Sequence, residues 1–458
     1  MDVTAWAWGL SQAYTIDMDL TPLGHPIPML SWVFAALVTT QAVLRLVLLA
    51  RQVRHVQSHR GQVPSAFSHR VGLADHQKAA DYSSAKAQLE AAAVLTGAAV
   101  LLAWTLLGGL DALNHALRSW IHDPMPSPTT ALSYQIALVL AITLISALAD
   151  APLDLLRHFG VEQRFGFNRM TLKDYAGDAL KGMMLGAALM TPVLAVVLWL
   201  MGQAGPEWWL WAFAVLACFQ LLMMVVVPTW IAPLFNRFAP LNDQVLEARV
   251  RQLMQRCGFD AQDLLVMDGS RRSAHANAYF TGLGRAKRVV FFDTLLKTLS
   301  PQEVEAVLAH ELGHFRHRHV IQRLVLMLAM SLLGLWLLGA ASQWSGFYLG
   351  LGVQPNLLAP NDGLALALFS LTLPTALFLL GPLAAWWSRR QEFQADAFAA
   401  SQADPSALAS ALVKLHTDNA ATLTPDPWVV RFQYSHPPAV QRLQALGQLQ
   451  PIPTPTAT

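Results

Sequence analysis

The sequence is poor in charge, because only 13% of its 458 residues are Asp, Glu, Lys or Arg, about half the share of an average soluble protein. Hydrophobic residues make up 54%. This balance excludes a disordered chain and an ordinary water-soluble enzyme, and it favours a polytopic membrane protein. The only two cysteines, Cys218 and Cys257, exclude a disulfide framework and a four-thiolate zinc site.

The positive and negative charges nearly balance, and the formal net charge of the whole chain is +2. Basic residues follow the ends of apolar stretches and form no stripe with interleaved aromatic residues, so we expect no nucleic-acid partner. No basic segment precedes the first apolar stretch, and we therefore expect no cleavable signal peptide. The sequence carries no signal for an oligomeric state.

Long apolar runs are abundant, and a membrane helix needs about 20 apolar residues. We predict seven such helices, at residues 29–50, 91–110, 131–149, 182–201, 208–227, 324–341 and 363–387. With seven spans, every Lys and Arg except Arg118 falls on one side of the membrane. Because these residues collect in cytoplasmic loops, we place the N-terminus outside and the C-terminus in the cytoplasm. Short outer loops and the lack of a dilysine-type retrieval signal favour a bacterial inner membrane over the endoplasmic reticulum.

Residues 310–314 read His-Glu-Leu-Gly-His, and they follow a helix start with Ser300 as N-cap, Pro301 at the first position and Glu303 completing a capping box. Four residues apart on a helix, His310 and His314 share a face and can both reach one zinc ion.

Glu311 projects at the adjacent angle, where it can take a proton from an attacking water. The nearby His317 and His319 are expected to be surface or interfacial residues and not further ligands.

A catalytic zinc needs a third protein ligand, and the candidate is Glu392. Asp396 lies four residues further on and can accept the N–H of a ligating histidine, which fixes the orientation of that ring. From the residues alone, an amphipathic helix with ordinary charges is the alternative interpretation. Arg389 and Arg390 are expected to anchor the membrane boundary.

Several further blocks, in order along the chain, resemble those of the Ste24-type CAAX prenyl proteases, in the M48 group of zinc metallopeptidases. The blocks are 162–168 (EQRFGFN), 231–238 (IAPLFNRF), 273–279 (SAHANAY), 290–295 (VFFDTL), 392–396 (EFQAD) and 434–442 (YSHPPAVQR). The resemblance covers nearly the whole chain.

The resemblance implies one Zn²⁺ per chain held by His310, His314 and Glu392, with Glu311 as the general base and Asp396 supporting a ligand. It places His436 and Arg442 near the developing oxyanion, and Asn277 and His275 beside the substrate. From the residues alone, His436 is equally suited to cap a helix starting at Pro437, and Arg442 to a surface ion pair. The stretch 273–283 reads as a strand, which can pair with an extended substrate if it lies at a sheet edge.

The implied fold is a mainly α integral membrane protein whose seven helices enclose a chamber, with a cytoplasmic gluzincin-like metalloprotease domain containing a small β-sheet. The predicted parts are a five-span membrane region (1–227), the first half of the catalytic domain (228–323), the sixth and seventh spans (324–387), the second half (388–450) and a flexible tail (451–458).

The implied activity is zinc-dependent removal of the C-terminal tripeptide from prenylated substrates, at the cytoplasmic face of the lipid bilayer. One alternative is a quality-control endopeptidase of the same chemistry that acts on membrane proteins without a prenyl group. The other is a transporter or scaffold, which the scarcity of ionisable residues within the spans disfavours.

Overall fold

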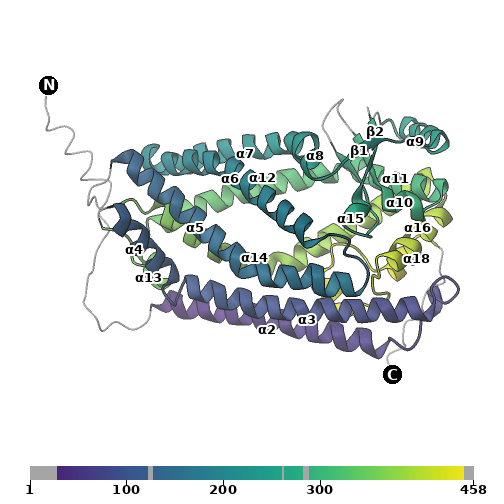
Figure 1. Ribbon diagram of the computed structural model, residues 1–458, viewed down its shortest axis with the longest axis horizontal. Helices are drawn as coiled ribbons and strands as arrows, with labels where there is room; N and C mark the ends of the chain where they lie inside the picture. Colours follow the sequence, from purple (N-terminus) through teal and green to yellow (C-terminus); the bar gives the residue numbers. More distant parts are fainter. Residues whose placement is uncertain (1–27, 122–126, 260–262, 282–287, 358, 448–458) are drawn as a thin grey trace.

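The structure, a computed structural model, describes residues 28–121, 127–259, 263–281, 288–357 and 359–447. Seven helices in this part of the chain are long and apolar enough to cross a membrane, which confirms the predicted number. They contain α2 (Met29–Ser58), α3 (Leu73–Trp104), α5 (Pro128–Leu155), α6 (Leu172–Gln203), α7 (Trp208–Val226), α12 (His319–Ser342) and α14 (Asp362–Leu377). Figure 1 shows them running along the long axis, with α2 and α3 side by side. The predicted tail, 451–458, lies outside the described residues.

All seven helices continue beyond the predicted spans into segments that we assigned to the cytoplasm, and three of them do so through adjoining helical elements. α5 passes into η2 (Leu156–Glu162), α7 into η4 (Val227–Ile231) and α8 (Ala232–Phe235), and α14 through η6 (Phe378–Leu380) into α15 (Gly381–Gln402). The domain boundaries predicted at 227/228, 323/324 and 387/388 therefore fall inside continuous helical segments. The membrane part and the catalytic part share these helices and are not joined by linkers.

The second span ends earlier than the predicted residue 110. α3 stops at Trp104, the chain turns, and the separate helix α4 (Gly109–Ile121) begins. The turn needs glycine, since Gly108 has φ +78° and a Cβ on Gly109 would lie 2.5 Å from the backbone oxygen of Ala103. With the short α13 (Ser345–Gly350), α4 lies at the end of the bundle opposite the sheet (Figure 1).

The membrane helices meet in one apolar core toward that same end. Its buried members include Phe34 of α2, Leu138 of α5, Leu198 of α6, Leu338 of α12 and Leu368 of α14. Toward the other end this shared packing is lost: in α6, which begins at residue 172, the first buried side chain is at position 194. α6 is therefore loosely packed at the end near the sheet, whereas α2 and α3 remain buried against each other there.

A four-stranded sheet confirms the small β-sheet that we predicted. Its order is β1 (Phe238–Pro240), β2 (Asp263–Met267), β4 (Arg288–Phe292) and β3 (Ala278–Thr281). β2 and β4 are parallel, and the outer pairs are antiparallel. The strand predicted over 273–283 is shorter, at 278–281, and it forms one edge of the described sheet; residues 282 and 283 lie outside the described residues.

Six helices lie just before and after the sixth and seventh spans in the described chain. They are α9 (Gln244–Arg256), α10 (Asp293–Thr298), α11 (Pro301–Arg316), α16 (Pro405–Asp418), α17 (Pro427–Gln433) and α18 (Ala439–Ala445). α9, α10, α11 and α16 share an apolar core with the sheet, whereas α17 and α18 pack against α15. Leu308 and Leu312 of α11 share one apolar core with Leu408 and Leu412 of α16. The hairpin formed by α12 and the α14–α15 segment thus brings the chain segments before and after it into contact.

Candidate metal centre and active-site cavity

The start of α11 is fixed by the capping box that the sequence predicts. The Ser300 hydroxyl accepts the backbone N–H of Glu303, and the Glu303 carboxylate accepts the backbone N–H of Ser300 at 2.7 Å. Glu303 also accepts hydrogen bonds from Ser410 and Lys414 of α16, each at 2.7 Å. The first turn of α11 is therefore held against α16, which sets the direction in which the later histidines point.

The crossing of α11 and α15 depends on Gly313. A Cβ at this position would lie 2.8 Å from the Cα of Ala395 and 3.0 Å from its backbone oxygen. The two backbones therefore meet as closely as they can, because any larger residue would have to push them apart. This close crossing places His310 and His314 of α11 opposite Glu392 of α15.

Three donor groups converge at the crossing. The Nε2 atoms of His310 and His314 are 3.3 Å apart, and each is 3.4 Å from an oxygen of the Glu392 carboxylate. One ligand atom from each of the three residues lies within 4.8 Å of the others. Glu392 is 2% exposed, and its buried Oε2 has no hydrogen-bond partner among the described residues. A buried carboxylate oxygen without a donor, facing two imidazole nitrogens, fits a divalent metal with nitrogen and oxygen ligands.

Asp396 fixes the ring of His310. Its Oδ1 lies 2.8 Å from Nδ1 of His310, and Arg442 donates to both of its oxygens, which keeps the carboxylate ionised. The N–H of His310 is therefore on Nδ1 and points to Asp396. The lone pair of Nε2 is then directed toward His314 and Glu392.

His319 gives His314 the same support, and our expectation of a surface or interfacial residue was wrong for it. His319 is 1% exposed; its Nδ1 lies 2.9 Å from Nδ1 of His314 and its Nε2 lies 3.0 Å from Oε1 of Gln394. With Gln394 accepting the N–H of His319, the neutral His319 accepts the N–H of His314. Nε2 of His314 is then free to bind a metal, whereas His317 is exposed as expected.

Arg442 and His436 both reach this centre. Arg442 is 7% exposed and paired with Asp396, so it does not form the surface ion pair that we considered. Its Nη1 has no hydrogen-bond partner within the described ranges. His436 does not cap the next helix, because α18 begins at Ala439 without a side-chain cap. Nε2 of His436 lies instead 3.6 Å from Glu392.

A cavity of about 280 Å³ opens beside the three donor groups. It is lined by Ala276, Asn277, Ala278, Leu295, Val307, His310, Glu311, Glu392, Leu408, Leu412, Leu415, His416, Asn419, Ala421, His436 and Arg442. Burial raises the pKa of Glu311 above its ordinary value, which brings this carboxylate nearer to the range that a general base at neutral pH requires. Asn277 lies at the cavity, immediately before the edge strand β3.

His275 does not line the cavity. Its ring stacks on Phe167 with centroids 4.4 Å apart, its Nδ1 lies 3.2 Å from Oδ1 of Asn419, and its Nε2 lies 3.5 Å from Glu162. Both ring nitrogens therefore face protein groups. These contacts favour a structural role for His275, tying the 162–168 loop to the catalytic part.

Two residues near the site received no role in it from the sequence. His416 lines the cavity, its Nδ1 bonds the backbone oxygen of Leu412 at 3.0 Å, and burial lowers its pKa to about 4, which keeps the ring neutral. Arg389, which we expected at the membrane boundary, donates to the backbone oxygens of Val430 and Tyr434 at 2.7 and 2.8 Å. It thereby holds the end of α17 and the loop that carries His436.

Comparison with known proteins accounts for nearly the whole chain. Residues 52–237 match the family described as CAAX prenyl protease N-terminal, five membrane helices, and residues 240–450 match peptidase family M48. The chain is 34% identical to the CAAX prenyl protease 1 homolog of Oryza sativa subsp. japonica, over 68% of this chain and 73% of that protein. It is 30% identical to CAAX prenyl protease 1 of Saccharomyces cerevisiae, over 84% of this chain and 88% of that protein.

A solved structure is similar over the same extent. The crystal structure of S. mikatae Ste24p superposes with a TM-score of 0.83 at 28% sequence identity, covering 92% of this chain and all of the other. The similarity therefore includes the membrane bundle as well as the catalytic part.

Proposed function

The chain belongs to peptidase family M48, with the membrane domain of the CAAX prenyl proteases, and we propose that it removes C-terminal tripeptides from prenylated proteins. It is a multi-pass membrane metalloendopeptidase, and membership of this family excludes the transporter or scaffold that the sequence left open. The observation that carries the proposal is the convergence of His310, His314 and Glu392 beside a cavity that Glu311 also lines.

We propose zinc as the metal, held by those three residues, since two imidazoles and one carboxylate form a known catalytic zinc set with an open position. When bound, zinc supplies Lewis-acid activation of the water and of the peptide carbonyl. Asp396 and His319 hold the two histidines in the tautomers that such binding needs.

The remaining steps belong to side chains that line the cavity. Glu311 takes a proton from the attacking water and passes it to the leaving amine. His436 and Nη1 of Arg442 supply donors for the carbonyl oxygen as it gains charge. Asn277 and the edge strand β3 align the extended substrate backbone by strand addition, with Asn277 contacting the peptide.

The loose packing of α6 near the sheet supports a chamber between the helices, with the catalytic part at its mouth. In α7 and α12 too, few residues toward this end are buried. A hollow of this kind would give a substrate that comes from the membrane apolar surroundings close to the site.

The direct test is cleavage of a farnesylated peptide that ends in Cys-aliphatic-aliphatic-X, with the released tripeptide identified by mass spectrometry. Glu311→Gln should keep one zinc per chain and lose at least about 100-fold in kcat, because the proton acceptor is gone. The matched control is Glu305→Gln on the same helix, whose carboxylate pairs with Arg249 and Arg256 instead. Cleavage by Glu311→Gln at the normal rate would contradict the mechanism.

An unmodified peptide of the same sequence separates this task from quality control. A lipid-dependent enzyme should cleave the farnesylated peptide with the higher kcat/KM, whereas equal values for the two peptides would favour the quality-control alternative.

We also propose that the sheet end faces the cytoplasm, with the N-terminus outside, in a bacterial inner membrane. Arg118, the one basic residue predicted outside, lies on α4 at the end of the bundle opposite the sheet. There it donates a hydrogen bond to Asn356. An impermeant thiol reagent should label a cysteine placed at Ser119 in intact cells, and one at Gln252 only after permeabilisation. The reverse pattern would overturn this orientation.

A further inference from the structure

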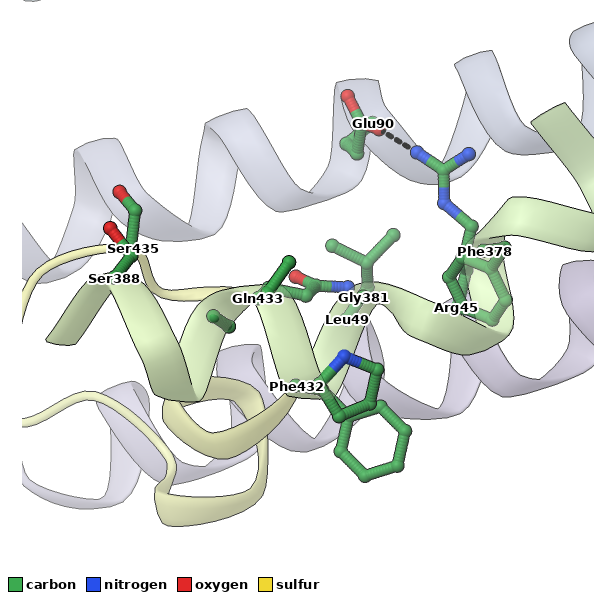
Figure 2. A pocket seen from close by; sticks show the side chains of 12 residues that line it. Arg45, Leu49, Glu90, Phe378, Gly381, Ser388, Phe432, Gln433 and Ser435 are labelled. Atoms are coloured by element: carbon green, nitrogen blue, oxygen red, sulfur yellow. Dashed lines mark hydrogen bonds and ion pairs between the residues drawn. The ribbon is translucent and has the colours of Figure 1, made fainter. Parts of the chain in front are cut away.

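A second cavity, of about 700 Å³, lies between α2, α3, α15 and the end of α17. We call it the α2–α15 pocket, and Figure 2 shows it from close by. It is lined by Arg45, Leu49, Glu90, Phe378, Gly381, Pro382, Ala384, Ala385, Ser388, Phe432, Gln433 and Ser435. It is larger than the cavity beside the three donor groups, and none of the steps above uses it.

The pocket lies at a break in the seventh span. α14 ends at Leu377, η6 follows, and α15 starts at Gly381 with a proline in its first turn. A proline there supplies no N–H to bond the preceding turn, so the helix can change direction. The break lies close to Trp386 and Trp387, residues of the type that gathers where a span meets the membrane surface.

Polar groups lie at the two ends of the pocket, and apolar groups lie between them together with the amide of Gln433 (Figure 2). In Figure 2, Ser388 and Ser435 are at one end and the Arg45–Glu90 ion pair is at the other, with Leu49 between. The apolar part of the lining also includes Phe378, Pro382 and Ala385. The walls therefore suit an apolar chain better than a peptide, whose backbone groups would need hydrogen-bond partners.

The serine end adjoins the catalytic site. Ser388 lies one helical turn before Glu392 on α15, and Ser435 directly precedes His436 and contacts its Nδ1 at 2.9 Å. Ser435 and His436, neighbours in the chain, line the two cavities, so this is the end at which a group attached to a peptide beside His436 would enter the pocket.

The far end is lined by the Arg45–Glu90 ion pair, and Arg157 lies nearby. Arg45 donates to Glu90 at 2.5 Å, and Arg157 lies 3.9 Å from the other oxygen of the same carboxylate. Because an apolar chain cannot replace the contacts of these charged groups, the ion pair is expected to persist and to limit how far the chain can extend.

We infer that the α2–α15 pocket holds the isoprenoid chain of the substrate, with the thioether at the serine end and the hydrocarbon tail directed toward Arg45 and Glu90. This inference rests on the proposed function, because it requires a lipidated cysteine next to the cleaved bond. The largely apolar lining and the adjacency of Ser388 and Ser435 to Glu392 and His436 support this occupant.

Ala384→Trp tests the pocket by filling it, since Ala384 lines the cavity and is already exposed. It should lower the ratio of kcat/KM for the farnesylated peptide to that for the unmodified peptide roughly tenfold or more, because the tail loses its apolar contacts. The matched control is Leu383→Trp, on the neighbouring residue, which is 64% exposed and does not line the pocket. A ratio that falls equally in both variants, or in neither, would overturn the inference.

A binding experiment decides the question without catalysis. A peptide with a photoactivatable isoprenoid analogue should label Leu49 or Phe432 in Glu311→Gln, and excess farnesylated peptide should suppress this labelling. Labelling that only phospholipid suppresses, or that falls elsewhere in the bundle, would assign the pocket to another occupant. If the wild type leaves both peptides uncut, the proposed function fails, and the labelling still reports whether the pocket binds the chain.

Discussion

Arg442 donates two hydrogen bonds to the carboxylate of Asp396, from Nε to Oδ2 at 2.7 Å and from Nη2 to Oδ1 at 2.6 Å. A two-point contact of this kind fixes the plane of the carboxylate as well as its charge. Asp396 in turn lies 2.8 Å from Nδ1 of His310. A residue near the end of the chain therefore sets the orientation of the first histidine on α11.

Asp396→Asn should weaken zinc binding by about 10- to 100-fold, because the amide would lack the charge that aligns His310 and pairs with Arg442. The measurement is a competitive titration with a fluorescent chelator. Asp75→Asn, at an exposed position in the first turn of α3, serves as the control and should leave the zinc affinity unchanged. Equal affinities for the wild type and Asp396→Asn would refute the support role.

His319→Ala should lower zinc affinity by about tenfold or more, since Nδ1 of His314 would lose its partner and the ring could turn away. His317→Ala is the natural comparison, two residues earlier and exposed. It should behave like the wild type in the same titration. If the two variants lose affinity to the same extent, His319 has no special role.

Gly313→Ala should damage both folding and metal binding, because the new methyl group would lie 2.8 Å from the backbone of Ala395. Overpacking of this kind costs about 1–3 kcal/mol, and here it also separates the histidines from Glu392. Thermal unfolding in detergent and zinc content measure the two effects. In Gly334→Ala, where a Cβ meets nothing within 4 Å, both should stay at the wild-type values.

Glu303→Gln should destabilise the protein at neutral pH by about 1–2 kcal/mol, because glutamine can still cap α11 but loses the charge that faces Lys414. Burial alone would raise the pKa of Glu303, yet bonds from Lys414, Ser410 and Ser300 hold it below its ordinary value. The ionised form is therefore favoured in the folded protein, and its contribution is full above the unfolded pKa of about 4.5.

As the pH falls below that value, the stability gap between Glu303→Gln and the wild type should narrow, and it should close below the folded pKa. Melting curves in detergent at several pH values provide the measurement. Glu247→Gln, which loses only a surface pair with Arg251, should show almost no difference at any pH. A gap that widens in acid would contradict the assigned direction.

Local patterns in the sequence were sufficient for the membrane helices and for the start of α11. Apolar runs, caps and the four-residue spacing of His310 and His314 depend on neighbours close in the chain, so they can be read directly. The same patterns misplace the end of the second span. They also do not show that α14 continues through η6 into α15, because the continuity depends on packing around the break.

His319 shows why some site residues escape a sequence argument. A histidine five residues after His314 on a new helix looks like a surface residue, and only the packing of α12 against α15 buries it next to Gln394. His275 illustrates the reverse case: its sequence block predicts a place beside the substrate, whereas the structure stacks its ring on Phe167 and does not place it in the cavity lining.

By itself the sequence determined that the protein lies in a membrane, because 13% of its residues are charged and it has seven long apolar helices. It also determined the chemistry, through the paired histidines and the acidic residues of a metallopeptidase. The tertiary structure decided which distant residues meet. Glu392 reaches His310 because Gly313 lets α11 and α15 touch, and Arg442 reaches Asp396 because α18 folds back against α15. Such contacts arise from packing between segments far apart in the chain, and the spacing of residues within one segment cannot predict them.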